Sequence, residues 1–226
     1  MKVASIAAVE DRARQSRGIS NDAVLEAVMR ALSEREIRGD CIVDVGCGEG
    51  NLHRLVRSRF GRYVGIDVVR YADFPSVAEF CILNLDTGRI PLPEGSADVV
   101  AALEVIEHLE NPREFMRKLV RLAKPGGWII VTTPNQLSLL SLLTLAVRHR
   151  FQAFQDVHYP AHLTALLEVD LRRIATECHL TEIEIEYTLI GRIPLTDAHY
   201  PRFLARWFPC MLSENVLLIG RTMDDK

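Results

Sequence analysis

The feature that most constrains this chain is a short apolar run that carries an acid and then breaks into alternate glycines. Residues 43–51 read VDVGCGEGN, with Asp44 in the run and Gly46, Gly48 and Gly50 after it. Glycine lets the backbone turn sharply and approach a ligand at a point where a Cβ would collide. The pattern therefore predicts a strand followed by a loop that lines a nucleotide-type pocket.

The glycine spacing bears on which ligand this pocket takes. A dinucleotide fingerprint reads Gly-x-Gly-x-x-Gly before a helix, and here Asn51 stands where its third glycine would be. A tight strand-to-helix turn without a ligand is the simpler alternative. The density of glycine and the acid just upstream favour the pocket.

Length, charge and cysteine content narrow the class of protein. The chain has 226 residues, a formal net charge of −3 and a pI near 6.2, which argues against a general affinity for nucleic acid or an anionic membrane, although a local basic patch would not show in the net charge. The basic residues at 148–150 fit the solvated end of a helix. Its five cysteines are scattered and form no Cys-x-x-Cys pair, so neither a disulfide framework nor a zinc site is expected. The N-terminal apolar stretch is too short for a secretory signal. We expect one cytoplasmic domain over residues 1–226.

Periodicity predicts alternating strands and helices. Helical spacing is present over residues 21–38, 52–60, 111–123 and 164–179, with Asn21 and Pro112 as start signals. Apolar or alternating runs predict strands over residues 41–45, 63–68, 80–85, 97–103, 128–133, 181–190 and 215–222. This order predicts an α/β fold in which helices cover both faces of a parallel sheet, ligands bind at the carboxyl ends of the strands, and the last two strands pair antiparallel at one edge. Residues 1–38 are expected to form an N-terminal lid and helix.

Four motifs in this order resemble class I S-adenosylmethionine-dependent methyltransferases across about residues 21–190. They are VDVGCGEGN, the acid in YVGIDV, the segment IPLPEGSADVVAALEVIEHLENP, and LAKPGGWIIVTTPN. The sequence motifs EVIEHLENP and TTPN are most similar to those of the branch that contains the ubiquinone-biosynthesis O-methyltransferases. The resemblance implies a Rossmann-like, seven-stranded, mostly parallel sheet with an antiparallel last strand, and S-adenosyl-L-methionine as the cofactor.

Two carboxylates are predicted to bind this cofactor. Asp44 is placed to favour the cationic amino-acid end, and the glycine loop with the N-terminus of the following helix suits the cofactor's carboxylate. Cys47, within that loop, is also a predicted cofactor-binding residue. Asp67, about twenty residues after the first glycine, is suited to accept from both ribose hydroxyls, and Val68 follows it. The simpler alternative for Asp67 is a helix cap.

The resembled family usually has an acid after the third strand that accepts from the adenine amino group. Here the sequence reads CILNLDTG, so the role falls on Asn84 or on Asp86, depending on register, with Leu85 between them. The amide oxygen of Asn84 is also an acceptor. We predict all three as cofactor-binding residues.

The segment Glu104 to His108 follows the fourth predicted strand, where the methyl-transfer cleft is expected. Methyl transfer depends mainly on alignment, and a base is needed only if the nucleophile must lose a proton. His108 is the predicted base because neutral imidazole accepts a proton at neutral pH. Its simpler role is to cap a helix or to bind a backbone carbonyl. Glu104 is expected beside the methionine end of the cofactor, and Glu107 is expected to face solvent.

A metal site is the alternative interpretation of the same residues. Glu104, Glu107, His108 and a distant His162 or His158 resemble the ligand set of Hen-type small-RNA 2′-O-methyltransferases, in which Mg²⁺ or Mn²⁺ lies beside a ribose hydroxyl. However, the His-Phe-Glu-Trp motif of that family is missing, and the chain is negatively charged. We therefore predict no metal, and we regard nucleic acid as an unlikely partner.

Two segments are predicted to form the acceptor side, residues 136–164 and 191–213. His158, Tyr159 and His162 are the predicted substrate contacts in the first; the alternative is a plain loop in which Thr164 caps the next helix.

The run LSLLSLLTLAV over residues 137–147 is far short of the roughly twenty residues of a bilayer span. It fits a buried helix, a dimer contact or an apolar mouth for a lipid-like acceptor, and burial is the favoured interpretation.

Together these observations predict a methyltransferase that methylates oxygen on a small molecule, a sugar or a lipid intermediate. Peripheral membrane contact is compatible with the sequence, and the oligomeric state is open. A metal-assisted RNA methyltransferase and a catalytically silent cofactor-binding partner are the alternatives.

Overall fold

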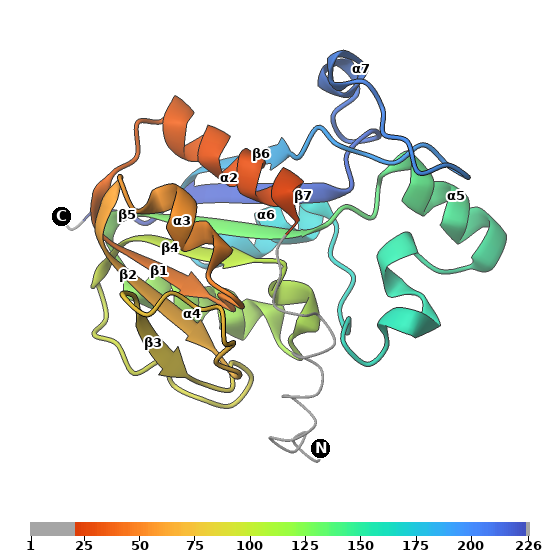
Figure 1. Cartoon of the computed structure of the whole chain (residues 1–226). Coiled ribbons are helices and arrows are strands. Elements are labelled where there is room, and N and C mark those ends of the chain that lie inside the picture. Colours follow the sequence, from red (N-terminus) through yellow and green to blue (C-terminus); the bar gives the residue numbers. More distant parts are fainter. Residues whose placement is uncertain (1–20, 225–226) are drawn as a thin grey trace.

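Seven strands form one twisted sheet in the order β3-β2-β1-β4-β5-β7-β6 (Figure 1). The computed structural model describes residues 21–224. The first five strands are parallel, whereas β7 runs antiparallel to both of its neighbours. The strands are β1 (Gly39–Val45), β2 (Phe60–Asp67), β3 (Glu79–Ile82), β4 (Ala97–Leu103), β5 (Ala123–Pro134), β6 (Thr181–Tyr187) and β7 (Asn215–Arg221). The predicted Rossmann-like sheet with an antiparallel last strand is confirmed.

Six α-helices and three short 3₁₀ turns connect the strands of the described region. The helices are α2 (Asp22–Glu34), α3 (Asn51–Val56), α4 (Pro112–Leu122), α5 (Leu139–Arg148), α6 (Glu168–Glu177) and α7 (Arg202–Trp207). The 3₁₀ turns are η1 (Ile106–His108), η2 (Gln152–Phe154) and η3 (Asp156–His158). Within residues 21–224, no helix combines the length and the apolar character needed to cross a bilayer.

The predicted boundaries differ from the observed ones at several ends. Asn21 caps α2 as expected, since its side-chain oxygen accepts from Ala23 N. The helix predicted over residues 52–60 ends earlier, because Phe60 already begins β2. Thr164 does not cap the next helix; its hydroxyl donates to Leu109 O, and α6 begins at Glu168. Residues 1–20 of the predicted lid lie outside the described residues.

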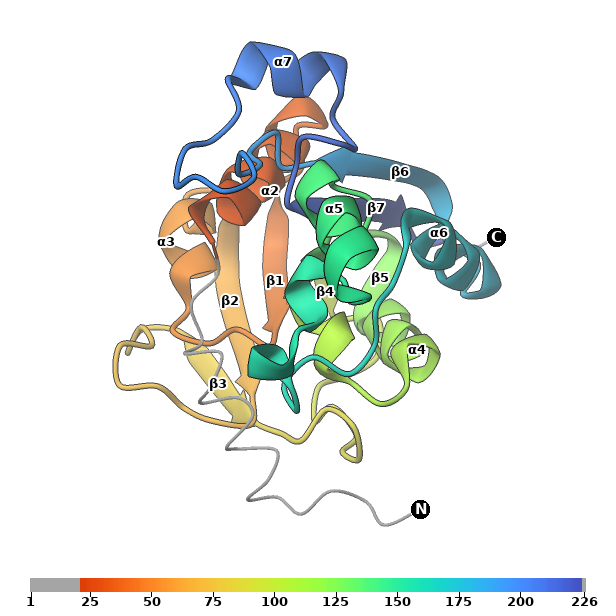
Figure 2. The ribbon, with the colours of Figure 1, turned by 90° about the vertical axis from the view of Figure 1, so that its right-hand side faces the viewer.

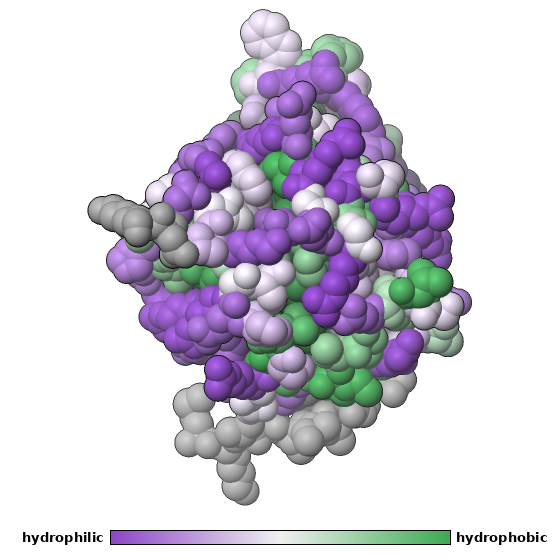
Figure 3. Space-filling view, turned by 90° about the vertical axis from the view of Figure 1, so that its left-hand side faces the viewer, coloured by the Kyte–Doolittle hydropathy of each residue, from purple (hydrophilic) through white to green (hydrophobic). Residues whose placement is uncertain are grey.

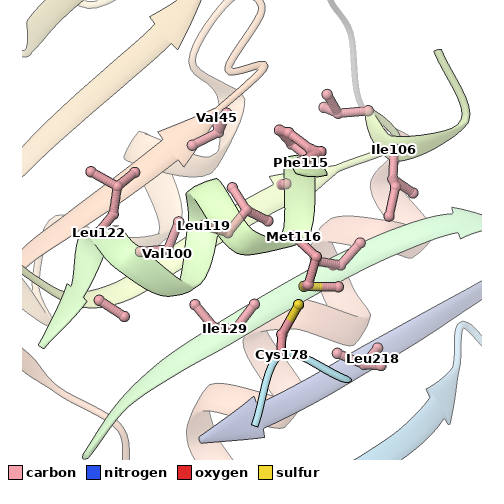
Figure 4. Close-up of a cluster of buried hydrophobic side chains, with 14 of the residues drawn as sticks. Val45, Val100, Ile106, Phe115, Met116, Leu119, Leu122, Ile129, Cys178 and Leu218 are labelled. Atoms are coloured by element: carbon pink, nitrogen blue, oxygen red, sulfur yellow. The ribbon is translucent and has the colours of Figure 1, made fainter. Parts of the chain in front are cut away.

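One hydrophobic core lies between the sheet and the layer formed by α4, α6 and η1. Alternate residues of β1, among them Val43 and Val45, point to this side together with side chains from β2, β4, β5 and β7. Helix α4 contributes Phe115, Met116 and Leu119, which are fully or nearly fully buried (Figure 4). Packing in this core holds η1, and therefore the segment after β4, against the sheet.

A second core lies on the opposite face, under α2 and α3. The intervening residue of β1, Ile42, points to this side with Tyr63 of β2, and α2 packs on them through a fully buried stripe that includes Val28 and Leu32. Because helices cover both faces of the sheet, the strand sequences are continuous apolar runs.

Helix α5 does not cover the sheet, and the favoured prediction that residues 137–147 form a buried helix is wrong. Ser141 is the only buried residue between the first and last residues of α5, whereas Leu142, Leu143 and Val147 are exposed. The helix lies beyond the carboxyl ends of the strands and packs mainly against η2 (Figure 2). The apolar character of the run therefore has a cause other than core packing.

Candidate functional site

The glycine loop leaves the carboxyl end of β1 in a left-handed conformation. Gly46 has φ +78° and Gly50, the N-cap of α3, has φ +74°. A Cβ on Gly46 would lie 2.2 Å from Val105 Cγ2, and one on Gly50 would lie 2.7 Å from Pro75 Cδ. These two glycines are therefore required by backbone conformation and by packing within the chain, in addition to the predicted approach of a ligand.

Asp67, the last residue of β2, holds the glycine loop in place. Its Oδ2 accepts from Gly48 N at 2.9 Å, and its Oδ1 accepts from Val68 N at 2.7 Å and Val69 N at 3.3 Å. Burial raises the pKa of this carboxyl, and the three backbone donors oppose the rise. The carboxylate thus lies beside the loop where the ribose is predicted, already fixed in orientation.

Asp44 lies on β1 with its carboxylate inside the protein. It is 3% exposed, and its Oδ2 accepts a hydrogen bond from the hydroxyl of Tyr63 on β2. Burial, partly offset by this hydrogen bond, raises the pKa of Asp44 to about 7, and the charge of Asp67 contributes to the rise.

Tyr63 is a site residue that the sequence analysis missed. Asp44 is paired with Gly65 across β1 and β2, and Tyr63 lies two residues earlier on the same face. Side chains two residues apart on a strand point to the same face, and Gly65 leaves space beside Asp44. These two features of the sequence identify Tyr63 as the neighbour of Asp44.

Cys47 is buried between the loop and β2. Its Sγ donates to Gly48 O at 3.8 Å, and burial raises the pKa of the thiol. A Cβ on Gly65 would lie 2.7 Å from this sulfur. The cysteine therefore fills space behind the glycine loop as an un-ionised side chain.

The segment after β3 forms a compact turn. Asn84 Oδ1 accepts from Asp86 N at 3.0 Å, and Asp86 Oδ1 accepts from Glu110 N at 2.9 Å. The carbonyl oxygen of Leu85 accepts from Lys118 Nζ at 2.7 Å. Both candidate adenine acceptors thus have fixed positions near the carboxyl end of the sheet, and which of them accepts from adenine stays a prediction.

Glu104 immediately follows β4 with φ +56°, a backbone conformation that non-glycine residues rarely adopt. Its Oε1 accepts from Asn215 Nδ2 at 2.9 Å, and its Oε2 lies 3.4 Å from Asn21 N at the start of α2. The side chain therefore connects the end of β4 with β7 and with the N-terminal helix.

Glu107 is fully buried, so the expectation that it faces solvent is wrong. Its Oε2 accepts from Thr133 Oγ1 at 3.0 Å, whereas its Oε1 has no hydrogen-bond partner among the described residues. Its backbone oxygen accepts from Leu163 N and Thr164 N, so the loop after η3 closes over it. Burial raises its pKa to about 8, and the charge of Glu104 adds to the effect.

Three imidazoles meet beside Glu107. The His108 and His162 rings pack edge to face with centroids 4.7 Å apart, and His158 stacks on His162 at 5.4 Å. His108 Nδ1 lies 2.9 Å from Ala161 O, and His162 Nδ1 lies 2.6 Å from Ala153 O.

Because a carbonyl only accepts, both Nδ1 atoms carry the proton, and Nε2 is the basic nitrogen of each ring. Burial, with the charge of His108, lowers the pKa of His162 to about 4, so that ring is neutral at pH 7. Ligand atoms of Glu107, His108 and His162 all lie within 4.8 Å of one another. The arrangement offers either a general base or ligands for a cation.

The structure thus brings His108, His158 and His162 together, and it places Tyr159 on the outside of the same loop, 72% exposed. The simpler interpretation of His108, a hydrogen bond to a backbone carbonyl, is present. It coexists with the predicted role as a base, because it fixes the ring and leaves that role to Nε2.

A family model described as a methyltransferase domain matches residues 15–182. The chain belongs to this methyltransferase domain family. The family is that of the class I enzymes, whose methyl donor is S-adenosylmethionine, and both the predicted family and the predicted cofactor are confirmed.

The methyltransferase domain has distant relatives of two kinds. A probable S-adenosylmethionine-dependent methyltransferase of Mycolicibacterium smegmatis is 34% identical over 120 residues, covering 50% of this chain and 45% of the relative. A ubiquinone biosynthesis O-methyltransferase of Albidiferax ferrireducens is 32% identical over 111 residues, covering 44% of this chain and 43% of the relative. The chain thus spans less than half the length of these relatives.

Solved structures share the fold of this methyltransferase domain. A SAM-dependent methyltransferase from Archaeoglobus fulgidus superposes with a TM-score of 0.61 at 18% identity, over 88% of this chain and 94% of that one. A putative methyltransferase from Haloferax volcanii, solved with its activator Trm112, gives 0.64 at 19% identity over 98% and 99%.

Proposed function

We propose that this protein transfers the methyl group of S-adenosylmethionine to an oxygen of a small molecule, a sugar or a lipid intermediate. The observation that carries the proposal is the placement of two buried carboxylates, Asp44 and Asp67, next to a left-handed glycine loop, with the fixed imidazole of His108 in the 3₁₀ turn after β4. Resemblance to ubiquinone biosynthesis O-methyltransferases supports oxygen as the acceptor atom.

The donor side needs a partner for each polar part of the cofactor. Asp44 is the acid for the cationic amino-acid end, where a desolvated carboxylate attracts a positive charge more strongly than one in water. Asp67 is the acceptor for the ribose hydroxyls, since its Oδ2, which accepts from Gly48 N, keeps a second lone pair for a hydroxyl. Asn84 or Asp86 accepts from the adenine amino group, and Glu104 borders the methionine end.

The chemical step needs alignment of an acceptor oxygen with the methyl group and removal of one proton. His108 Nε2 takes that proton from the acceptor hydroxyl, while the hydrogen bond from Nδ1 to Ala161 O holds the ring and its tautomer. The loop carrying His158 and Tyr159 contacts the acceptor. When bound, the cofactor supplies an electrophilic methyl group on a sulfonium.

Calorimetry with S-adenosylmethionine, followed by an acceptor screen that detects the demethylated product, tests this proposal. His108→Ala is expected to lower turnover by about 10²-fold or more while the affinity for the cofactor stays within about twofold. His179→Ala, an exposed histidine at the far end of α6, is the matched control. Full turnover by His108→Ala would show that the base is assigned wrongly, and absence of cofactor binding would contradict the function itself.

A metal-assisted transfer is the second candidate, and one observation favours it. Glu107 Oε1 is buried without a partner among the described residues and lies in a cluster with His108 and His162 whose ligand atoms suit a divalent cation. Glu107, His108 and His162 would then hold the cation, which would supply Lewis-acid activation of a ribose hydroxyl of RNA, and His108 would not act as the base. Turnover that is abolished by EDTA and restored by Mn²⁺, with no restoration in Glu107→Gln, would establish this candidate; turnover unaffected by EDTA would exclude it.

A further inference from the structure

Exposed apolar side chains concentrate on one side of the molecule. Most of the large hydrophobic residues exposed in the described region belong to the two segments that were predicted to form the acceptor side. We call the following six residues the cap surface: Leu142, Leu143, Val147, Phe203, Trp207 and Phe208. Trp207 is 79% exposed and Val147 is 78% exposed, so these two side chains are not packed against the part of the chain that the structure describes.

The two halves of the cap surface are attached to each other. Leu139 N at the start of α5 donates to Met211 O in the turn after α7, at 2.8 Å, and Asn135 Nδ2 donates to Cys210 O at 2.6 Å. Figure 2 shows α5 lying across the face at the carboxyl ends of the strands, with α7 above it. The cap surface therefore lies on the same side as the histidine cluster.

The two stretches of chain that carry the cap surface are basic, although the whole chain carries −3. Residues 136–155 and 198–213 contain no Asp or Glu, and they include Arg148, Arg150, Arg202 and Arg206. Arg150 pairs with Asp156 and Arg202 pairs with Glu26, whereas Arg148 and Arg206 form no ion pair with any described residue. The opposite side of the molecule shows prominent hydrophilic residues with apolar ones in small groups (Figure 3).

We propose that the cap surface docks on an anionic lipid bilayer and, given the proposed function, that the acceptor is an amphipathic molecule taken from that bilayer. Trp and Phe side chains insert at the level of lipid headgroups, and neighbouring arginines bind the anionic headgroups. A second copy of the chain fits less well, because a two-fold contact would bring together two surfaces that each carry more arginines than acids.

Sedimentation with lipid vesicles tests the docking without any methyl transfer. The wild-type protein is expected to bind vesicles of phosphatidylcholine mixed with phosphatidylglycerol, and to bind pure phosphatidylcholine more weakly. High salt should reduce the difference. Phe203→Ser/Trp207→Ser and Leu143→Ser/Val147→Ser should each weaken binding by about fivefold or more. Leu55→Ser is the control, because Leu55 is an exposed leucine on α3, outside the cap surface.

These experiments test the docking proposal independently of the proposed methyl transfer. Unchanged cofactor affinity in the cap variants shows that they are folded. The docking proposal is wrong if the wild type does not bind anionic vesicles, or if the cap variants bind them as the wild type does. Either result holds even where a water-soluble acceptor is methylated. A dimer in light scattering that Trp207→Ser converts to a monomer would assign the surface to a second copy and overturn it. Vesicle binding without cofactor binding would instead contradict the proposed function and leave the docking intact.

Discussion

The hydroxyl of Tyr63 donates a hydrogen bond to the Asp44 carboxylate, and both side chains are buried between β1, β2 and α3. The ring of Tyr63 also packs edge to face against His53, with centroids 5.0 Å apart. Tyr63 therefore positions the acid that is proposed to attract the cationic end of the cofactor.

Removal of this hydroxyl should weaken cofactor binding without unfolding the protein. Tyr63→Phe leaves a buried carboxylate without its donor, which costs about 1–3 kcal/mol and corresponds to about a tenfold or greater loss of affinity if Asp44 meets the cofactor. Calorimetry with S-adenosylmethionine measures it. Tyr187→Phe is the matched control, because it removes a phenol–carboxylate hydrogen bond of 2.7 Å to Glu168 on another part of the sheet. Equal affinities in the two variants would contradict the role of Tyr63.

The pKa of Asp44 predicts how stability depends on pH. Folded Asp44 has a pKa of about 7, whereas the unfolded chain has the ordinary value near 4, so the folded state binds the extra proton between these values. The contribution of Asp44 to the free energy of unfolding is therefore fully present below pH 4 and is lost as the pH rises to 7. The loss is on the order of 2–4 kcal/mol. Denaturation of wild type and Asp44→Asn across this range measures it, and the variant should show a flatter profile. Identical profiles would show that Asp44 is ionised throughout.

The same ionisation predicts the pH dependence of cofactor binding. A cation favours the ionised carboxylate, so cofactor affinity should rise as the pH increases through about 7, with release of a proton on binding. Calorimetry in buffers of different ionisation enthalpy detects that proton. Affinity that falls over this range would contradict the assignment of Asp44 to the cationic end.

The glycine loop should tolerate no side chain at its first position. Gly46→Ala combines a left-handed φ with a Cβ 2.2 Å from Val105 Cγ2, so we expect a loss of about 2 kcal/mol or more in the free energy of unfolding. Gly95→Ala is the control, because Gly95 has φ +66° and a Cβ added there would meet no described atom within 4 Å, so that strain alone costs about 1 kcal/mol. Similar losses at both positions would show that the contact with Val105 relaxes freely.

Much of the fold was predictable because the information is local. Strands covered on both faces read as apolar runs, and the turn residues between them mark their ends, so β4 was predicted with its observed bounds. The family motifs also indicated where Asp44, Asp67 and His108 lie relative to the sheet, because each lies near or shortly after the carboxyl end of a strand.

What the sequence analysis missed depends on contacts between distant segments. Glu107 is buried because the loop after η3 closes over it, and local sequence carries no sign of that closure. Tyr63 meets Asp44 only across two paired strands. Helix α5 is apolar enough for a core, yet its position beyond the strand ends leaves it exposed, since periodicity does not say against what a helix packs.

The most direct measurement of the central claim is the affinity of Asp67→Ala and Asp67→Asn for S-adenosylmethionine. Asp67 orients the glycine loop through Gly48 N and is the proposed ribose acceptor, so calorimetry should show a loss of about 10²-fold in Asp67→Ala and a smaller loss in Asp67→Asn. Asp73→Ala, an exposed acid in the loop after β2, should bind as the wild type does. Wild-type affinity in a folded Asp67→Ala protein would contradict the proposal that the acids at the ends of β1 and β2 bind the methyl donor.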